Sequence, residues 1–495
     1  MEETQRECMQ VLHVLANSSP NINGYAVRSH DMLIAQLNTG LVEPIAITSP
    51  YYPEKTSMAV FHSKDGIDYH RCAHPAYRNS NRGLIRKWIA WRGKKKIPSE
   101  VSSTAEAKQI QRPTSFPKVV VWNTKWTIIH STRAVRRGIR ILTRPIRSLF
   151  TMGGSWVAEK TYIKMLEEEI QKLVEEKEPD LIHAHTPYRV GLPAMNVARK
   201  LNIPFVYEMR GIWEDTAVIN GRWRTWGLPY RRFRRMENRV LRGADHVYCI
   251  SEQLKKDAIS RGVDAEGITI VRNAVNDELF TGDGKDGHSE LISSIIEDLK
   301  LSEETIVIGY IGSIQRLEGL ETLATAVSNL DENLDVRLLI VSTEKNQKYF
   351  REYCESAGIG DIAIIAGPVP RENISECYRL IDIFAVCRPP GYRVTEIVTP
   401  LKPFEAMARG LPVIVSNLPA LKEIVEDRST GLCFEAGDHL DLSRKISTLI
   451  SDKELRIQLG KDGQKWIMKN RLWSKVIVNS IDGYRRLLAK FASQK

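Results

Sequence analysis

Residues 398–438 read VTPLKPFEAMARGLPVIVSNLPALKEIVEDRSTGLCFEAGD, and this stretch predicts one helix followed by one buried strand. Thr399 suits the N-cap position, Pro400 suits the first helical position, and Gly410 suits the position just after the helix. The apolar residues 412–416 have the length and composition of a buried strand. A helix that leads into a buried strand is one unit of an α/β fold with a parallel sheet.

Two charged side chains lie near the start of this predicted helix. A helix N-terminus offers unpaired backbone N–H groups and a partial positive charge, which favour phosphate. Lys402 adds a full charge, and Glu405, one turn after Leu401, offers two oxygens to sugar hydroxyls. These groups suit a nucleoside diphosphate. The alternative is an ordinary amphipathic α/β unit in which both charges are solvated.

The rest of the chain repeats the same alternation in two halves. At 495 residues the chain is long enough for two large domains. Short apolar strands alternate with helical runs, which predicts a parallel sheet with right-handed crossovers in each half. The predicted strands of the first half are residues 9–16, 42–47, 180–185, 205–209, 246–250 and 268–271, and those of the second are 306–311, 336–341, 362–365, 381–386 and 412–416. Predicted helices in the first half include 28–39 and 155–178.

Local composition predicts the domain boundaries. Residues 281–288, TGDGKDGH, are glycine-rich, charged and without periodicity, and we take them as the hinge. The first domain is then 1–280, with a basic, irregular insertion at about 75–150, and the second domain is 289–472. The remaining residues, 473–495, contain a final helix at 473–491.

Composition also excludes several classes of protein. Hydrophobic residues make up 42% and charged residues 26%, which is ordinary for a folded, water-facing protein. No run approaches the ~18 apolar residues of a membrane-spanning helix, and the acidic start MEETQREC is unlike a secretory signal peptide. The seven cysteines are scattered and form no CxxC pair. We therefore expect a reducing cytoplasm and no structural zinc.

The net charge of +11 is concentrated in two basic runs. Residues 221–242 hold eight arginines interleaved with four aromatic residues, and residues 82–96 read RGLIRKWIAWRGKKK. Arginine with aromatic residues can lie against an anionic membrane, grip nucleic acid or form a solvated helix face. We favour an anionic membrane surface or a lipid-linked acceptor over the solvated face, and nucleic acid is the least favoured partner.

The sequence EAMARGLPV at 405–413 resembles the nucleotide-sugar signature of retaining glycosyltransferases of family 4, which have the GT-B fold. The resemblance covers most of the second half and several patches of the first. It implies two doubly wound Rossmann-like domains that face each other across a cleft, with the C-terminal helix packing back on the first domain. It also implies that Glu405 holds the nucleotide ribose, with Leu401 and Lys402 beside the donor.

Residues 308–320, IGYIGSIQRLEGL, resemble the phosphate loop of this family. Gly312 lets the backbone approach the diphosphate closely. Many family members carry an arginine after that glycine and a lysine just before the later one, whereas this chain has Ser313 and Glu318. An unneutralised leaving diphosphate would slow sugar transfer severely. We expect Ser313 still to contact the donor, and the compensating charge to come from Arg316, Arg388 and Lys402.

The resemblance also implies a base-binding loop and a pair of glutamates. The loop 367–370, GPVP, fits the segment that holds the nucleotide base, which makes Val369 a donor contact. The family motif separates its two glutamates by seven residues, but eight residues separate Glu396 from Glu405. A one-residue bulge would bring Glu396 to the sugar. Glu396 and Lys402 are therefore the predicted catalytic residues of the second half.

The first half contributes one predicted catalytic histidine. The sequence IHAHTP at 182–187 resembles the strand end that the family directs into the cleft. On that pattern His185 contacts the transferred sugar. The alternative is a polar cap or a core histidine, which is the commoner role for a lone histidine at a strand end.

The acceptor site is predicted at neighbouring strand ends of the first half. Arg210 follows the strand 205–209, and its planar guanidinium suits an anionic acceptor. The alternative for Arg210 is an ion pair with Glu214 or Asp215. Gly24 and Tyr25, in the turn after the first strand, complete the predicted acceptor site.

Together these residues predict retaining sugar transfer from a nucleotide diphosphate sugar, used as a co-substrate, to a saccharide or lipid-linked acceptor. Cell-surface polysaccharide or glycolipid synthesis suits such an acceptor. The scheme requires no metal, and we expect the enzyme in the cytoplasm, peripheral on the inner face of the membrane. Two alternatives stay open: a GT-B scaffold without catalysis that binds membrane or nucleic acid, and a sugar phosphorylase or epimerase.

Overall fold

The structure is a computed structural model that describes residues 8–21, 23–50, 61–72, 144–280 and 290–493. The chain divides into two compact units, Met1–Arg71 with Glu167–Lys495, and Cys72–Leu166. Both sheets belong to the first unit. The basic run 82–96, the hinge 281–288 and the insertion 75–150, except for its last residues from 144, lie outside the described residues.

The first sheet has eight strands in the order β3-β4-β2-β1-β5-β6-β7-β8, and only the β3-β4 pair is antiparallel. Strands β5 and β6 are buried along their whole length, and this burial includes their polar residues His183, His185 and Glu208. The strands are β1 (Met9–Leu15), β2 (Val42–Thr48), β3 (Phe61–Lys64), β4 (Ile67–Arg71), β5 (Leu181–His185), β6 (Phe205–Met209), β7 (His246–Cys249) and β8 (Ile268–Ile270).

The second sheet has six parallel strands in the order β11-β10-β9-β12-β13-β14. One continuous core of buried aliphatic and aromatic side chains surrounds it. The strands are β9 (Ile306–Ile311), β10 (Val336–Val341), β11 (Ala363–Ala366), β12 (Ile383–Val386), β13 (Val413–Ser416) and β14 (Leu432–Phe434).

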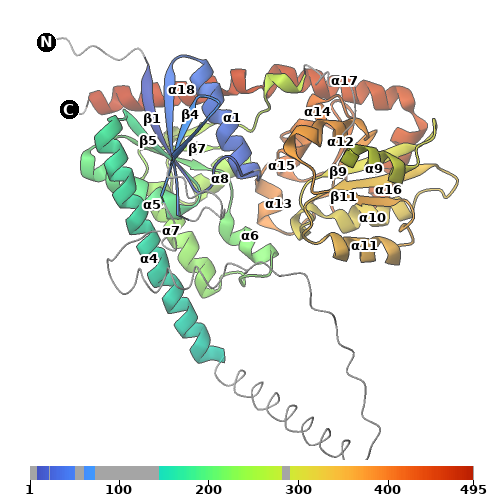
Figure 1. Cartoon of the computed structure of the whole chain (residues 1–495), viewed down its shortest axis with the longest axis horizontal. Coiled ribbons are helices and arrows are strands. Elements are labelled where there is room, and N and C mark those ends of the chain that lie inside the picture. The colour runs from blue at the N-terminus through green and yellow to red at the C-terminus, as the bar shows by residue number, and fades with distance from the viewer. Residues whose placement is uncertain (1–7, 22, 51–60, 73–143, 281–289, 494–495) are drawn as a thin grey trace, which may run out of the picture. The chain divides into compact units, whose positions relative to one another are not determined.

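Helices connect the parallel strands and pack in pairs, α5 against α7 beside the first sheet and α10 against α16 beside the second (Figure 1). No helix in the described part of the chain is both long enough and apolar enough to cross a membrane. The helices are α1 (Gly24–Asn38), α4 (Arg144–Lys177), α5 (Tyr188–Leu201), α6 (Trp213–Ile219), α7 (Leu228–Gly243), α8 (Glu252–Ser260), α9 (Glu290–Leu299), α10 (Leu320–Ser328), α11 (Gln347–Ser356), α12 (Ile374–Arg379), α13 (Arg393–Ile397), α14 (Lys402–Ala408), α15 (Pro419–Lys422), α16 (His439–Ser451), α17 (Lys453–Asn470) and α18 (Trp473–Ala492).

The last helix, α18, returns to the first sheet. It packs against α1 and β8, and the side chain of its Tyr484 is fully buried. The Gln36 side-chain amide donates to the Tyr484 hydroxyl at 3.1 Å, and the Tyr248 hydroxyl donates to the Ser480 carbonyl at 2.6 Å. These contacts confirm the expectation that the C-terminal helix packs back on the first half.

Most predicted strands match the structure within two residues, but several helix starts were predicted wrongly. Helix α14 begins at Lys402, and Thr399 does not cap it. The physical reason is that the Thr399 carbonyl and hydroxyl both accept from the Asn273 amide, at 3.1 and 3.3 Å. Helix α1 begins at Gly24 because the Asn23 side chain accepts from the Ala26 N–H, and α4 begins well before residue 155.

Candidate active site

The predicted site residues of both halves follow the carboxyl ends of parallel strands. Gly312 follows β9, and Arg388 lies two residues after β12 in the second sheet. In the first sheet His185 ends β5 and Arg210 follows β6. Carboxyl ends of parallel strands meet at one edge of a sheet, which is where open α/β sheets bind ligands.

Residues 312–319 form the loop between β9 and α10, which we call the Gly312 loop. Two glycines allow this loop to lie close to the neighbouring elements. A side chain at Gly312 would place its Cβ 2.5 Å from Lys402 Cε. Gly319 has a φ of 66°, and a Cβ there would lie 1.8 Å from the Cys387 carbonyl oxygen. Any other residue at Gly319 would therefore push the loop off the end of β12. Within the loop, the Gln315 side-chain amide donates to the Ser313 hydroxyl at 2.9 Å.

Two cations converge on one carboxylate beside this loop. Lys402 Nζ lies 3.0 Å from Glu318 Oε1, and Arg388 Nη2 lies 3.6 Å from the same oxygen. Burial alone would raise the pKa of the Glu318 carboxyl, but the Lys402 and Arg388 charges outweigh burial and hold this pKa below its ordinary value. Glu318 is therefore ionised at neutral pH. Arg316, the third predicted cation, is exposed and does not join this cluster.

Glu405 lies one turn into α14, and its Oε2 accepts from the Tyr378 hydroxyl at 2.8 Å. Burial, followed by the Glu405 charge, raises the pKa of Tyr378 well above its ordinary value, so the phenol stays a donor. Leu401 immediately precedes the helix and faces the first half, since a Cβ at Gly24 would lie 3.7 Å from Leu401 Cδ1.

The base-binding loop predicted at 367–370 is anchored by a single amide. Gln347 Nε2 lies 3.2, 3.3 and 3.1 Å from the carbonyl oxygens of Ser342, Ala366 and Gly367. Val369 itself is 8% exposed. The start of the loop is thus tied to the ends of β10 and β11 through the Gln347 side chain, and its contact with a nucleotide base stays a prediction.

A buried polar network fills the strand ends of the first half around Glu208, which is fully buried in β6. Arg28 Nη2 lies 2.8 Å from Glu208 Oε1, and Arg210 Nε lies 2.7 Å from Glu208 Oε2. His185 Nδ1 lies 2.5 Å from the same Oε2. Burial opposes ionisation of Glu208, but Arg210 and Arg28 outweigh it and hold the pKa of its carboxyl well below the ordinary value. Arg210 therefore pairs with Glu208, and the alternative pairing with Glu214 or Asp215 is wrong.

His185 is a neutral, buried member of this network. It is 1% exposed, and burial, reinforced by the Arg210 charge, lowers the pKa of His185 to about 3. Its Nε2 lies 3.0 Å from His13 Nδ1. The ring is therefore enclosed in this structure, and its contact with a transferred sugar stays a prediction.

Three histidines of the described residues have the spacing of metal ligands: the ring nitrogens of His13, His183 and His185 lie within 4.8 Å of one another. Arg28 and Arg210 belong to the same network, and a divalent cation would add to their charge. Both ring nitrogens of His185 are already engaged. We therefore interpret the cluster as a polar core and do not assign a metal to it.

The same network reaches the start of α14. Arg28 Nε donates to Asn273 Oδ1 at 2.7 Å, and the Asn273 amide donates to the Thr399 carbonyl at 3.1 Å. Tyr25 lies beside it, with its ring 4.9 Å from the Arg210 guanidinium carbon, and its hydroxyl accepts from the Ala16 N–H at 3.1 Å. The predicted acceptor residues Gly24, Tyr25 and Arg210 therefore lie together, next to the loop that precedes α14.

The remaining predicted catalytic residue, Glu396, lies on the short helix α13. Its neighbour Arg393 joins α13 to the first half, because it pairs with Asp257 and lies 3.6 Å from Asp215. The role of Glu396 stays a prediction.

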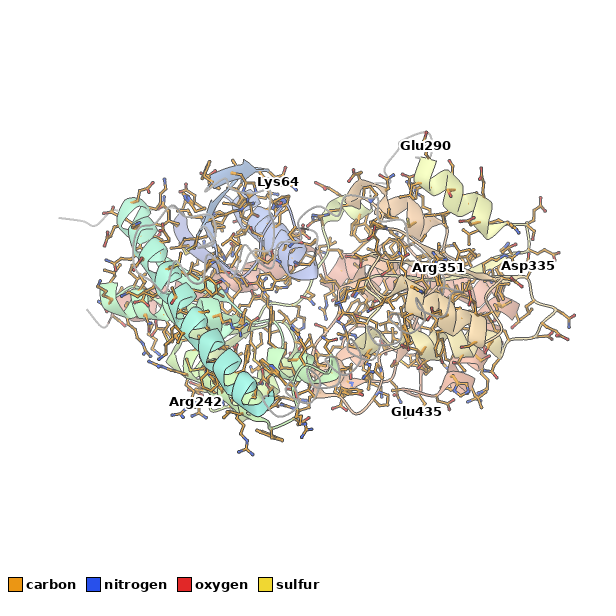
Figure 2. All side chains as sticks on the ribbon, turned by 60° about the horizontal axis from the view of Figure 1, so that its bottom comes forward. Lys64, Arg242, Glu290, Asp335, Arg351 and Glu435 are labelled. Carbon is orange, nitrogen blue, oxygen red and sulfur yellow. The ribbon has the colours of Figure 1, made fainter. Side chains whose placement is uncertain are left out.

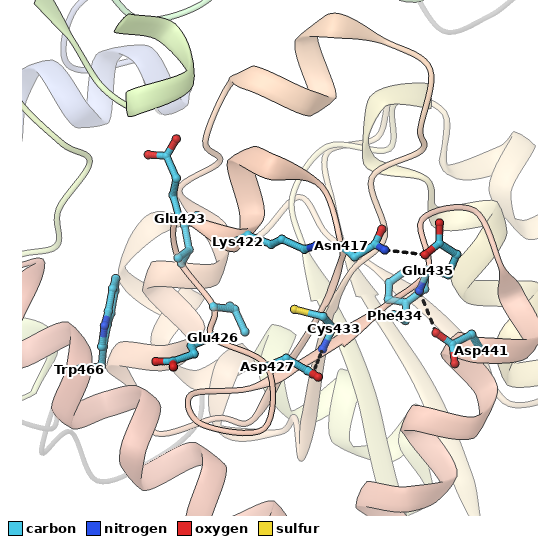
Figure 3. A pocket seen from close by; sticks show the side chains of 12 residues that line it. Asn417, Lys422, Glu423, Glu426, Asp427, Cys433, Phe434, Glu435, Asp441 and Trp466 are labelled. Carbon is cyan, nitrogen blue, oxygen red and sulfur yellow. Dashed lines mark hydrogen bonds between the residues drawn. The ribbon is translucent and has the colours of Figure 1, made fainter. Parts of the chain in front are cut away.

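A hollow of about 650 Å³, which we call the β14 hollow, lies beside β13 and β14 (Figure 3). None of the predicted site residues lines it. Its carboxylates hold local structure: Asp441 accepts from the Glu435 N–H, Asp427 accepts from the Cys433 N–H, and Glu435 accepts from the Asn417 amide (Figure 3). We assign no substrate to this hollow.

Several residues that shape the site were not predicted from the sequence. Glu208 carried a usable signal, because an acidic residue inside a buried strand needs a charged partner. No such signal marked Arg28, Gln347 or Tyr378, since each matters through contacts to residues far away in the sequence.

Two family models match the chain in adjacent segments. The model described as "Glycosyl transferases group 1" matches residues 292–466, and the model described as "Glycosyltransferase Family 4" matches residues 119–279. The first match contains the Gly312 loop, Glu318, Arg388, Lys402 and Glu405. The second contains His185, Glu208 and Arg210.

Individual proteins are similar to this chain over most of its length. The capsular polysaccharide biosynthesis glycosyltransferase CapM of Staphylococcus aureus is 24% identical over 350 residues, which are 68% of this chain and 83% of CapM. Sucrose-phosphate synthase from Thermosynechococcus elongatus has a similar fold, with a TM-score of 0.64, 16% identity and coverage of 97% of this chain and 100% of that one. The Anabaena protein HepE, solved in complex with UDP, has a TM-score of 0.58, 14% identity and coverage of 98% and 100%.

Proposed function

This chain belongs to the family-4 glycosyltransferases of the GT-B fold, and from that premise we propose that it transfers a sugar, with retention, from a nucleoside diphosphate sugar to a saccharide or lipid-linked acceptor. One observation carries the proposal: the Gly312 loop, Lys402, Arg388 and Glu405 converge at the strand ends of the second sheet. This set combines a close backbone approach, two cations and a sugar-binding carboxylate.

The geometry suits departure of a diphosphate from the sugar. Negative charge develops on the leaving diphosphate as the glycosidic bond breaks, and fixed cations in a water-poor site stabilise it. Lys402 and Arg388 supply that charge in this proposal, in the role that Mg²⁺ has in other transferases. Glu405 takes the ribose hydroxyls, and the loop 367–370 takes the base. The acceptor binds on the side of Gly24, Tyr25 and Arg210.

The relatives narrow the substrates to test. The HepE complex makes UDP the first nucleotide to examine. CapM supports an acceptor in cell-surface polysaccharide synthesis. A phosphorylase or epimerase on the same scaffold would release a free sugar phosphate or a changed sugar nucleotide, so product analysis separates these reactions from transfer.

The donor site is tested by thermal shift of the whole protein with UDP, GDP and ADP in the presence of EDTA. We expect one nucleoside diphosphate to raise the melting temperature, because a ligand that binds only the folded state stabilises it. Glu405→Ala should lower the affinity for that nucleotide about tenfold, because the charge-assisted hydrogen bonds to the ribose are lost.

Glu290→Ala is the matched control, because Glu290 is an exposed glutamate at the start of another helix (Figure 2). It should leave nucleotide binding unchanged. Unaltered affinity in Glu405→Ala would remove Glu405 from the site, and no shift with any nucleotide would contradict the proposed donor.

We also propose that the enzyme lies in the cytoplasm, bound to the inner face of the membrane. The solvent-exposed face of α7 supports the membrane binding. Arg231, Arg235, Arg239 and Arg242 are exposed, and their spacing of four, four and three residues puts them in one stripe along the helix. The one acidic residue of α7, Glu237, is 2% exposed. We call these four residues the arginine stripe, and Arg242 lies at the surface in Figure 2.

Aromatic and aliphatic side chains flank the arginine stripe. Trp226 is 55% exposed and Leu228 is 61% exposed. Trp226 also lines a hollow of about 790 Å³ together with the arginines of α7. Arginine beside exposed tryptophan and leucine is the combination that binds the headgroup region of anionic membranes.

Vesicle flotation tests this surface. The protein should bind vesicles that contain phosphatidylglycerol, should not bind pure phosphatidylcholine, and should dissociate as salt is raised. Replacing Arg231, Arg235 and Arg239 by glutamine should weaken binding about 100-fold, at ~1 kcal/mol per charge.

A triple variant with the same change in charge controls for net charge: Lys453, Lys461 and Lys469, exposed on α17, replaced by glutamine. Equal losses in the two triple variants would contradict a specific docking face. Binding to a single-stranded oligonucleotide without binding to vesicles would assign the stripe to nucleic acid instead.

A further inference from the structure

Resting on the proposed function, we infer that Glu318 is a positioning residue of the donor site. Its carboxylate holds Lys402 and Arg388 so that cations from α14 and from the end of β12 meet the diphosphate. In this way one acidic side chain in the phosphate loop organises two cations that come from outside the loop.

Glu318 is fixed within the loop. It is 3% exposed, and its N–H donates to the Gln315 carbonyl at 2.9 Å. The next residue, Gly319, packs directly against the Cys387 carbonyl, so the loop cannot slide along β12 without losing that contact. The carboxylate is therefore held at one place between β9, β12 and α14.

The two cations have different exposure. The Lys402 side chain is 23% exposed, whereas the Arg388 side chain is 6% exposed. Arg388 is also held by the Val398 carbonyl, which accepts from Nη1 at 2.7 Å. Lys402 Nζ lies 5.7 Å from the centre of the Tyr310 ring and next to Gly312. Lys402 is thus the cation that reaches a ligand, and Arg388 is the fixed one.

Glu318 has two opposite effects on a bound diphosphate. With two cations and one anion, the cluster has a net charge of +1, which favours phosphate. Removal of the carboxylate would leave Lys402 and Arg388 to repel each other, and the more exposed Lys402 would turn away. The carboxylate itself repels the phosphates. Its net effect therefore depends on whether Lys402 is present.

This dependence gives a test by calorimetric titration with UDP, or with GDP if UDP does not bind. In the wild-type background, Glu318→Gln should lower the affinity for UDP about tenfold, because Lys402 is no longer held in place. In the Lys402→Ala background, the same substitution should raise the affinity for UDP about threefold, because it then removes only the repulsion between the Glu318 carboxylate and the phosphates. The affinity for UMP, which lacks the β-phosphate, should change less than about twofold in either background.

Glu321→Gln is the matched control, since Glu321 lies three residues away on α10 and outside the cluster. A change in UDP affinity in the same direction in both backgrounds would overturn the inference, as would equal losses for UDP and UMP. If Glu318→Gln folds poorly, Glu318→Asp replaces it. The shorter carboxylate should draw Lys402 back from the ligand and lower the affinity for UDP by a smaller factor than Glu318→Gln does. A wild-type protein that binds neither UDP nor GDP is a different result, which refutes the proposed function itself.

Discussion

Lys402→Ala is expected to slow sugar transfer by about 100-fold or more, which is the usual effect of removing one group that stabilises transition-state charge. Lys402 is the more exposed of the two cations that face the Gly312 loop, so it carries most of the contact with the leaving diphosphate. Because this charge develops as the bond breaks, turnover should fall by a larger factor than donor affinity.

Hydrolysis of the sugar nucleotide by water provides the measurement, because it needs no acceptor. The variant Lys402→Arg keeps the charge in a different shape and should retain part of the activity. Lys422→Ala, in the β14 hollow, should have no effect on this hydrolysis. The role assigned to Lys402 would be wrong if Lys402→Ala kept more than half of the wild-type turnover, or if Lys402→Arg and Lys402→Ala lost equal activity.

Glu208→Ala is expected to reduce the free energy of unfolding by about 3–5 kcal/mol, enough to unfold many proteins. Glu208 is fully buried and is the shared partner of Arg28 and Arg210. Without it, two buried guanidinium groups would lie close together with no compensating anion. The loss should also reach the start of α14, because Arg28 orients Asn273 and Asn273 holds Thr399.

Urea unfolding followed by circular dichroism measures this effect. Asp68→Ala is the control, because Asp68 is an exposed carboxylate in the same sheet. It should change the unfolding free energy by less than about 0.5 kcal/mol. A similarly small change in Glu208→Ala would show that the network around Glu208 does not stabilise the fold.

The alternation of strands was predictable because buried parallel strands leave a direct trace in the sequence. Residues 205–209, 306–311 and 336–341 match their strands at both ends. The β3-β4 hairpin was missed although Asp65 and Gly66 form the turn, with φ of 51° and 78°. An Asp-Gly pair between short strands is a known hairpin signal. Its two short strands are mostly polar, so hydrophobic pattern alone did not reveal them.

The donor residues were more predictable than their interactions. Lys402, Glu405 and Gly312 stand out because their residue types suit phosphate and sugar at a strand-to-helix junction. The departure at Glu318 was visible in the sequence, but its pairing with Lys402 was not, because the two residues are 84 positions apart in the chain. The burial of His185 was also hidden, since it depends on His13 and Glu208 from other strands.

The central proposal is that a nucleoside diphosphate binds between the Gly312 loop and the start of α14. Hydrogen exchange of the whole chain, with and without the nucleotide that gives the thermal shift, tests it most directly. We expect slower exchange at the amides of residues 312–319 and 401–408, with little change in α7 or in the hollow beside β14. Unchanged exchange in those two segments while the nucleotide is bound would show that it binds elsewhere and would contradict the proposed donor site.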